Sequence, residues 1–186
     1  MLIVVAAALI ALVVPLAGGH FGNLGRVRLR GAWLVAAALL VQILIISVVD
    51  HAPDWLSRTF HLSTYVALGI FIVANRHIPW MWFIGIGALA NFVVISANGG
   101  VMPASRRALA AAGKELKDGF NNSTVVAHPH LSFLGDVMNT PKWLPFANVY
   151  SIGDIILMVG LVLVVFAVTR TDPAADAPFL RPVEAH

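Results

Sequence analysis

The chain has 186 residues, of which 59% are hydrophobic and 11% are charged, and its formal net charge is +3. Soluble domains are usually about 45–50% apolar and about 25% charged, so this composition is typical of an integral membrane protein. The absence of cysteine excludes disulfides, thiolate metal sites and a cysteine nucleophile, and the scatter of Lys and Arg between apolar runs indicates no nucleic-acid partner.

Five apolar runs predict an all-α, multi-pass transmembrane bundle, because about 20 apolar residues cross the roughly 30 Å hydrocarbon core. The third run gains length from a helix start at Pro53-Asp54. No basic residue precedes the first run, which we therefore interpret as a retained helix rather than a cleaved signal peptide. The predicted helices are residues 2–16, 32–49, 53–75, 78–97 and 152–168.

Arg26, Arg28 and Arg30 follow the first run, and basic residues in short loops mark the cytoplasmic side. The total numbers of Lys and Arg on the two sides are equal, so we follow the first helix and the short loops. We therefore expect a plasma membrane protein with its N-terminus outside and its C-terminus in the cytoplasm. The long connection 98–150 then lies outside, with a short helix over residues 103–116. Residues 1–170 form one domain, and the proline-rich tail 171–186 is expected to be disordered.

A stripe of small and polar residues on the fourth predicted helix includes Gly87 and Asn91. It predicts close packing against another helix, with Asn91 bonding across the interface or facing a ligand. Asp154 lies in the first turn of the last predicted helix, and Ser151 stands at capping-box spacing before it. An acid near the membrane is also a functional candidate, so capping and function both remain open for Asp154.

Asp136 lies in the long connection and approaches Asp154 if that connection folds back over the helices. Two neighbouring carboxylates repel, the pKa of one rises, and the pair can act as acid and base on a water molecule. Under this hypothesis Asp136 and Asp154 are catalytic. The alternative is that Asp136 is an ordinary turn residue.

Further polar residues stand near the ends of the predicted helices and complete a candidate pocket. Arg58 shares a helix face with His61 and Tyr65, and it either snorkels to the headgroups or holds an anionic group. His128 and His130 lack enough partners for a metal site, and no cofactor motif is present, so we expect no metal and no cofactor. The candidate ligand-binding residues are Arg58, His61, Asn91, Asn98 and Asn148.

The segments 98–103 (NGGVMP) and 134–136 (LGD), the latter leading to 145–154 (PFANVYSIGD), resemble an uncharacterised family of small multi-pass membrane proteins from actinobacteria and firmicutes. This resemblance covers most of the chain. It implies a bacterial plasma membrane protein and no activity, because the family is a domain of unknown function.

The start of the last predicted helix, after Asn148-Val149, is also similar to lipoprotein signal peptidase, a multi-pass aspartyl peptidase. Ser151 stands where the catalytic aspartate of that family belongs, and Asp154 comes three residues later. Asp136 is followed by Val137, outside the context of the family's partner aspartate. The similarity implies a peptidase, and these departures put that activity in doubt.

We expect the long connection to pack over the outer face and to form a polar pocket there. The favoured function is a non-enzymatic membrane component that binds a membrane lipid, a small ligand or another membrane protein. An aspartyl membrane hydrolase is the first alternative and a small transporter is the second. A transporter needs a polar path, and Gln42 is nearly the only polar residue in the inner halves of the helices.

Overall fold

The computed structural model describes residues 2–47, 53–114, 123–144, 147–172 and 177–181, and this part of the chain is mostly helical, as predicted. The α-helices are α1 Leu2–Leu16, α2 Gly22–Arg26, α3 Ala32–Ser47, α4 Asp54–Ala74, α5 Met81–Ala97, α6 Arg106–Ala111 and α7 Ile152–Arg170. The short strands are β1 Met102–Pro103, β2 Ser123–Thr124, β3 Met138–Asn139 and β4 Val149–Tyr150, and a 3-10 turn, η1, covers Ser132–Leu134.

The long helices α1, α3, α4, α5 and α7 occupy the five apolar runs of the sequence. Among the described residues, α4 and α7 are long and apolar enough to cross a membrane, and α5 is apolar but shorter. Helix α5 begins at Met81 rather than at the predicted residue 78. The reason is local: Pro79 disfavours a helical conformation at Ile78, and Trp80 adopts a left-handed conformation with φ of 65°.

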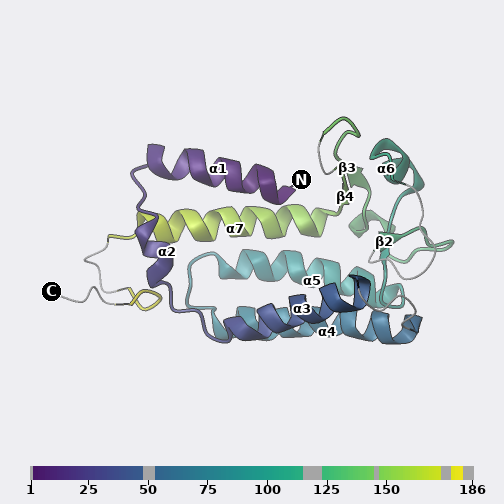
Figure 1. The fold of residues 1–186 in the computed structure, drawn as a ribbon, viewed down its shortest axis with the longest axis horizontal. Coiled ribbons are helices and arrows are strands. Elements are labelled where there is room, and N and C mark those ends of the chain that lie inside the picture. Colours follow the sequence, from purple (N-terminus) through teal and green to yellow (C-terminus); the bar gives the residue numbers. More distant parts are fainter. Residues whose placement is uncertain (1, 48–52, 115–122, 145–146, 173–176, 182–186) are drawn as a thin grey trace.

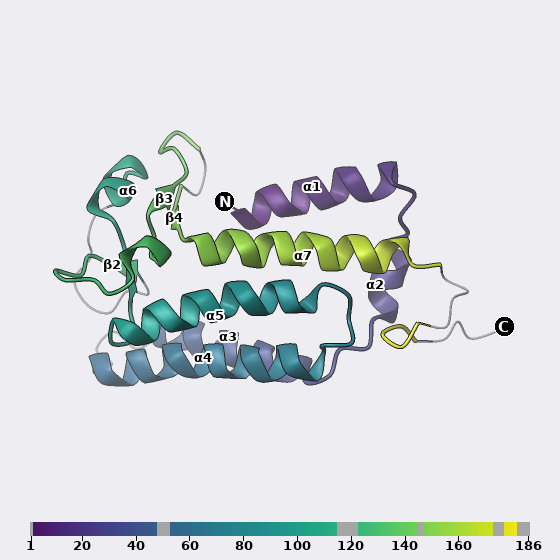
Figure 2. The same ribbon diagram turned by 180° about the vertical axis from the view of Figure 1, so that it is seen from behind.

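Helices α1, α7, α5 and α4 lie side by side in this order, and α3 packs against α4, in front of it in Figure 1 and behind it in Figure 2. Helix α7, which comes last in the chain, therefore lies between α1 and α5. The closest packing joins α5 to α7, where a Cβ atom added at Gly87 would lie 2.5 Å from the backbone nitrogen of Leu157. The predicted packing role of the stripe on α5 is confirmed, since Gly87, Ala88 and Asn91 are buried.

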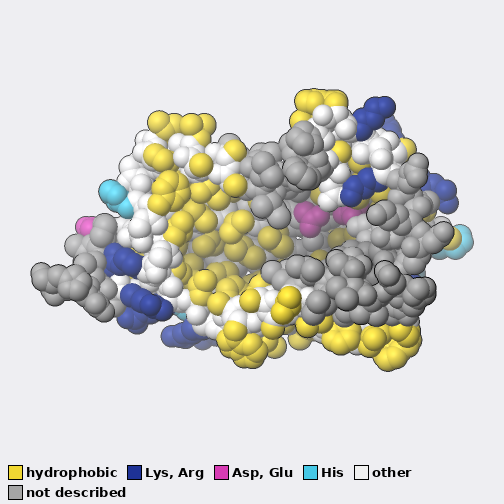
Figure 3. Space-filling model, in the orientation of Figure 1, with side chains coloured by type: hydrophobic (Ala, Val, Ile, Leu, Met, Phe, Trp, Pro, Cys, Tyr) yellow, Lys and Arg dark blue, Asp and Glu magenta, His cyan; other side chains and the backbone are white. Residues whose placement is uncertain are grey.

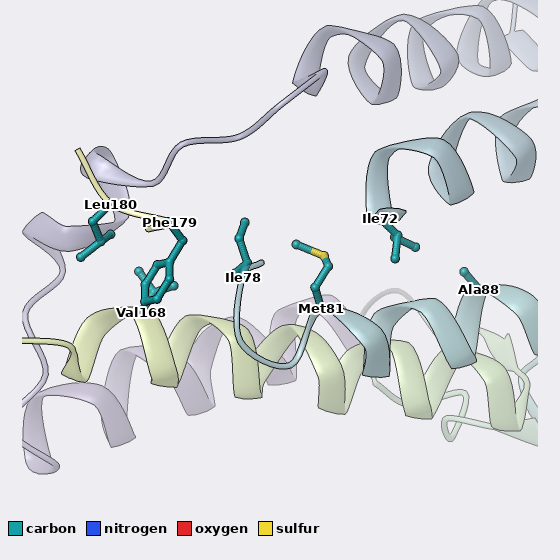
Figure 4. Close-up of a cluster of buried hydrophobic side chains, with 7 residues drawn as sticks. All are labelled: Ile72, Ile78, Met81, Ala88, Val168, Phe179 and Leu180. Atoms are coloured by element: carbon teal, nitrogen blue, oxygen red, sulfur yellow. The ribbon is translucent and has the colours of Figure 1, made fainter. Parts of the chain in front are cut away.

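A buried apolar cluster closes the end of the bundle where α2 lies (Figure 4). Phe179 and Leu180 pack there with residues of the α4–α5 connection and of α7. Leu180 also forms an antiparallel bridge with Val27. Residues 177–181 thus pack against the helices, although they lie in the tail expected to be disordered, because two large apolar side chains gain burial there. Residues 173–176 and 182–186 lie outside the described residues.

The connection between α5 and α7 forms a layer over the other end of the bundle (Figure 1). Strand β1 pairs in parallel with β2, and β3 pairs antiparallel with β4. Helix α6 is shorter than the predicted helix 103–116. Pro103 belongs to β1, and α6 begins after Ser105, whose hydroxyl accepts a bond from the Ala108 amide. The predicted residues 115–116 lie outside the described part of the chain.

Candidate functional site: a cavity between the helices and the loop layer

A cavity of about 280 Å³ lies where the loop layer meets α3, α4, α5 and α7. The space-filling view shows a hollow with an apolar floor and acidic side chains toward the loop layer (Figure 3). The polar lining residues are His61, Thr64, Tyr65, Asn91, Ser123, Asp136 and Asp154, and the apolar ones are Val35, Ala38, Leu68, Ile95, Met102 and Leu157.

Asp154 is held at the cavity by the first turn of α7. Its backbone amide donates to the Ser151 hydroxyl at 3.0 Å, and its carboxylate accepts from the Ser151 amide at 3.0 Å. The predicted capping box is therefore confirmed. The second carboxylate oxygen accepts a 2.7 Å bond from Asn91 Nδ2, while the Ser151 hydroxyl donates to Asn91 Oδ1 at 2.8 Å. These hydrogen bonds fix the position of the Asp154 carboxyl group at the cavity.

Asp136 reaches the cavity from the loop layer and is only 4% exposed. Its amide donates to the Pro103 carbonyl at 2.9 Å, and its carbonyl accepts from the Ser105 amide at 3.0 Å. The Ser123 hydroxyl donates to its carboxylate. Burial raises the pKa of Asp136 to about 6, the Ser123 bond opposes that rise, and the charge of Asp154 adds to it.

The loop thus folds back and brings Asp136 and Asp154 to one cavity in unlike environments. Burial raises the pKa of Asp136, whereas both carboxyl oxygens of Asp154 accept hydrogen bonds. The cavity therefore contains two carboxyl groups in different environments, an arrangement that can support acid and base roles. Among the residues that the structure describes, no three His, Asp or Glu side chains are grouped closely enough to hold a metal ion.

Helix α4 contributes His61 and Tyr65 to the cavity. The His61 Nδ1 lies 3.0 Å from the Gly100 carbonyl, and the two rings are 5.6 Å apart. His61 was predicted as a binding residue, while Tyr65 was recognised only as sharing its helix face. The sequence gives a signal for Tyr65, because residues four apart lie on one side of a helix. It gives none for Ser123, which reaches the cavity through the pairing of β2 with β1.

Three predicted binding residues do not line the cavity and instead stabilise the loop layer. Arg58 donates to the Gly99 carbonyl at 2.9 Å. The Asn98 side chain donates to the carbonyls of Val94 and His130 and accepts from the His130 amide. Asn148 is exposed and bonds to Thr140 through its backbone amide and carbonyl. Backbone groups at the end of a helix and in a tight loop need such partners.

Comparison with known proteins gives a family without a known function. A family model described as a family of unknown function (DUF5317) matches residues 26–166, so the chain belongs to this family. An uncharacterised protein of Thermotoga maritima is 29% identical over 155 residues, which cover 82% of this chain and 84% of the relative. No solved structure matches. The predicted membership of a family of unknown function is confirmed, and the similarity to lipoprotein signal peptidase stays a prediction.

Proposed function

We propose that this member of the DUF5317 family is a multi-pass plasma membrane protein that binds an amphiphilic ligand at its outer face. One observation carries the proposal. The cavity has an apolar wall formed by the long helices and two carboxylates where the loop layer covers it. Such a site suits a molecule with an apolar chain and a polar end.

The surface of the long helices supports the membrane part of the proposal. Leu16 is 80% exposed, Trp33 71%, Val73 62% and Leu89 60%. Exposure of so many large apolar side chains is unfavourable in water and favourable in hydrocarbon. Helix α5 has 17 residues and spans about 26 Å, so a local thinning of the bilayer completes its crossing.

The distribution of arginines supports the proposed orientation. Arg26, Arg28 and Arg30 lie on or just after α2, and Arg76 lies in the α4–α5 connection, so all four are at the end opposite the loop layer. An excess of basic residues in short loops marks the cytoplasmic side. The loop layer and the cavity beneath it then face the outside, with the N-terminus on the same side.

The charges in the cavity indicate which polar group the proposed ligand carries. Asp136 and Asp154 attract a cationic or hydrogen-bond-donating group and disfavour a polar end whose only charge is negative. Apolar lining residues such as Val35, Leu68 and Leu157 extend the site along the helices and suit an acyl chain. A membrane lipid with a primary amine in its headgroup meets both requirements.

A binding measurement on the full chain tests this proposal. We expect detergent-solubilised protein to bind short-chain phosphatidylethanolamine at least about tenfold more tightly than short-chain phosphatidylglycerol. At about pH 8, above the Asp136 pKa of about 6, Asp136→Asn should weaken the preference, because it removes a buried negative charge from the cavity. Asp54→Asn is the matched control, since that carboxylate is 64% exposed and lies outside the cavity. Equal affinity for both lipids, unchanged in Asp136→Asn, would contradict the proposal.

An aspartyl hydrolase is the second candidate, and the unlike environments of the two acids favour it. In such a reaction ionised Asp154 takes a proton from water while protonated Asp136 gives one to the carbonyl oxygen of an amide. The new C–O bond forms from the water, and the C–N bond breaks as the amine leaves with a proton. Both carboxylates must then contact one water molecule.

The hydrolase candidate is tested with a fluorogenic lipopeptide in detergent micelles. We expect Asp136→Asn and Asp154→Asn each to abolish cleavage, and Asp54→Asn to retain it. If the wild-type protein shows no turnover under conditions where the amine-bearing lipid binds, the hydrolase candidate is rejected and the binding function is retained.

A further inference from the structure

A second cavity, of about 470 Å³, lies at the end of the bundle opposite the two carboxylates. Arg30, Arg76 and His77 line it, together with apolar residues at the end of α4 and Pro178 of the C-terminal segment. These side chains come from three parts of the chain that the fold brings together. None of these residues lines the first cavity, of about 280 Å³, which we call the amphiphile-binding cavity.

The side chain of Asn75 holds Arg30 close to the end of α4. This side chain is fully buried, donates to the Arg30 carbonyl at 2.8 Å and accepts from the Arg30 amide at 2.8 Å. The same side chain donates to the Phe71 carbonyl at 2.8 Å. The segment before α3 is thereby joined to the end of α4, which keeps Arg30 beside Arg76 and His77. Flanking arginines that only set topology need no such clamp.

The C-terminal segment completes the rim. Phe179 and Leu180 are buried in the apolar cluster of Figure 4, which brings Pro178 to the cavity. The Arg28 amide donates to the Phe179 carbonyl at 2.9 Å. The Arg181 amide donates to the Arg26 carbonyl at 2.8 Å, so burial and two backbone hydrogen bonds hold the C-terminal segment at the cavity.

Among the residues that the structure describes, no acidic side chain pairs with the arginines that line this cavity. Within the described ranges, neither Arg30 nor Arg76 forms an ion pair, and the salt bridge found there joins Arg58 to Asp54 at the other end. In the same part of the chain, the buried His77 Nε2 has no hydrogen-bond partner. A buried ring nitrogen without a partner is unfavourable, so a small rotation toward an incoming ligand would gain a bond.

We propose that this second cavity binds a phosphate group, with Arg30 and Arg76 pairing its oxygens and His77 donating a hydrogen bond. Arginine suits this role because its planar guanidinium presents paired donors to phosphate oxygens. The phosphate belongs to an anionic lipid headgroup or to a soluble phosphorylated molecule. At a cytoplasmic face, basic pockets between helices suit the first source.

Binding measurements on the detergent-solubilised full chain test the proposal and separate the two sources. One arm titrates short-chain phosphatidic acid and the other inorganic phosphate. We expect saturable binding in at least one arm, weakened about tenfold or more by Arg76→Gln and by His77→Ala. Arg107→Gln, an exposed arginine on α6 at the opposite end, should leave the affinity unchanged.

The two arms give distinct readings. Binding of phosphatidic acid without binding of phosphate indicates a lipid headgroup, and tight binding of inorganic phosphate indicates a soluble source. The melting temperature of each variant without ligand shows whether it is folded, since Arg76 is exposed and its replacement leaves the core intact. Absence of saturable binding in both arms, or equal losses in Arg76→Gln and Arg107→Gln, overturns the proposal.

Discussion

Asn91 on α5 donates a 2.7 Å hydrogen bond to the carboxylate of Asp154 on α7. The same amide accepts a bond from the Ser151 hydroxyl, so one buried side chain joins two helices and the cap of α7. This contact sets the position of the Asp154 carboxylate in the cavity. The interface of α5 and α7 is therefore the closest helix packing in the fold, and it also positions a side chain of the candidate site.

Replacement of Asn91 by leucine should therefore destabilise the protein. The substitution removes one hydrogen-bond partner each from the Asp154 carboxyl group and the Ser151 hydroxyl at the interface of α5 and α7, which costs about 1–3 kcal/mol. The measurement is the melting temperature in detergent. Asn148→Ala is the control, because the Asn148 side chain is exposed and should change stability by less than about 0.5 kcal/mol. A neutral Asn91→Leu variant would show that the contact contributes nothing to stability.

The close approach of α5 and α7 gives a second prediction. A Cβ atom at Gly87 would lie 2.5 Å from the Leu157 backbone nitrogen and 2.9 Å from its Cα, so Gly87→Ala must push the helices apart. We expect a loss of about 1–3 kcal/mol, measured as a lower melting temperature. In contrast, Gly69→Ala on α4 meets no atom within 4 Å and should be neutral or stabilising. Similar behaviour of the two variants would contradict this packing.

The raised pKa of Asp136 predicts a dependence of stability on pH. The folded state holds a proton up to about pH 6, whereas an unfolded aspartate releases it near pH 4. The free energy of unfolding therefore falls as the pH rises from about 4 to about 6, by about 2–3 kcal/mol in total. Asp136→Asn should remove this slope, and Asp54→Asn should retain it. Melting temperatures between pH 4 and pH 7 check the prediction, and an unchanged slope in Asp136→Asn would refute it.

Filling the amphiphile-binding cavity should block its ligand. Leu68 lines the cavity, and the larger indole of Leu68→Trp occupies the space proposed for an acyl chain. We expect at least about a tenfold loss of affinity for the amine-bearing lipid. Ile70→Trp, on the same helix but 54% exposed and outside the cavity, should bind normally. Unchanged affinity in Leu68→Trp would place the ligand elsewhere.

The five long helices could be predicted from the sequence because each apolar run is long and its ends carry local signals, whereas the five-residue helix α2 was not predicted. Proline and aspartate begin α4, and the serine of a capping box begins α7. The end of α5 was also predictable, since Gly99 and Gly100 adopt positive φ in the reversal that follows it. These features depend on neighbours in the chain, so a single sequence contains them.

The site could be predicted only in part, because contacts distant in the sequence form it. Asp136 and Asp154 were identified by their chemistry, but an isolated β-bridge to Ala104 holds Asp136 at the cavity, and a single bridge has no periodic pattern in the sequence. The same limit applies to the second cavity. Nothing in the sequence predicts that Pro178 returns to the end of α4, since two buried side chains of the tail determine it.

Cysteine labelling in intact cells tests most directly the central claim that the chain spans the membrane with its loop layer outside. The chain has no cysteine, so single substitutions give a clean background. Ser132→Cys in the loop layer and Leu29→Cys at the opposite end are both exposed positions. We expect a membrane-impermeant maleimide to label Ser132→Cys in intact cells and Leu29→Cys only after permeabilisation. Labelling of Leu29→Cys alone in intact cells, or recovery of the protein in the soluble fraction, would contradict the account.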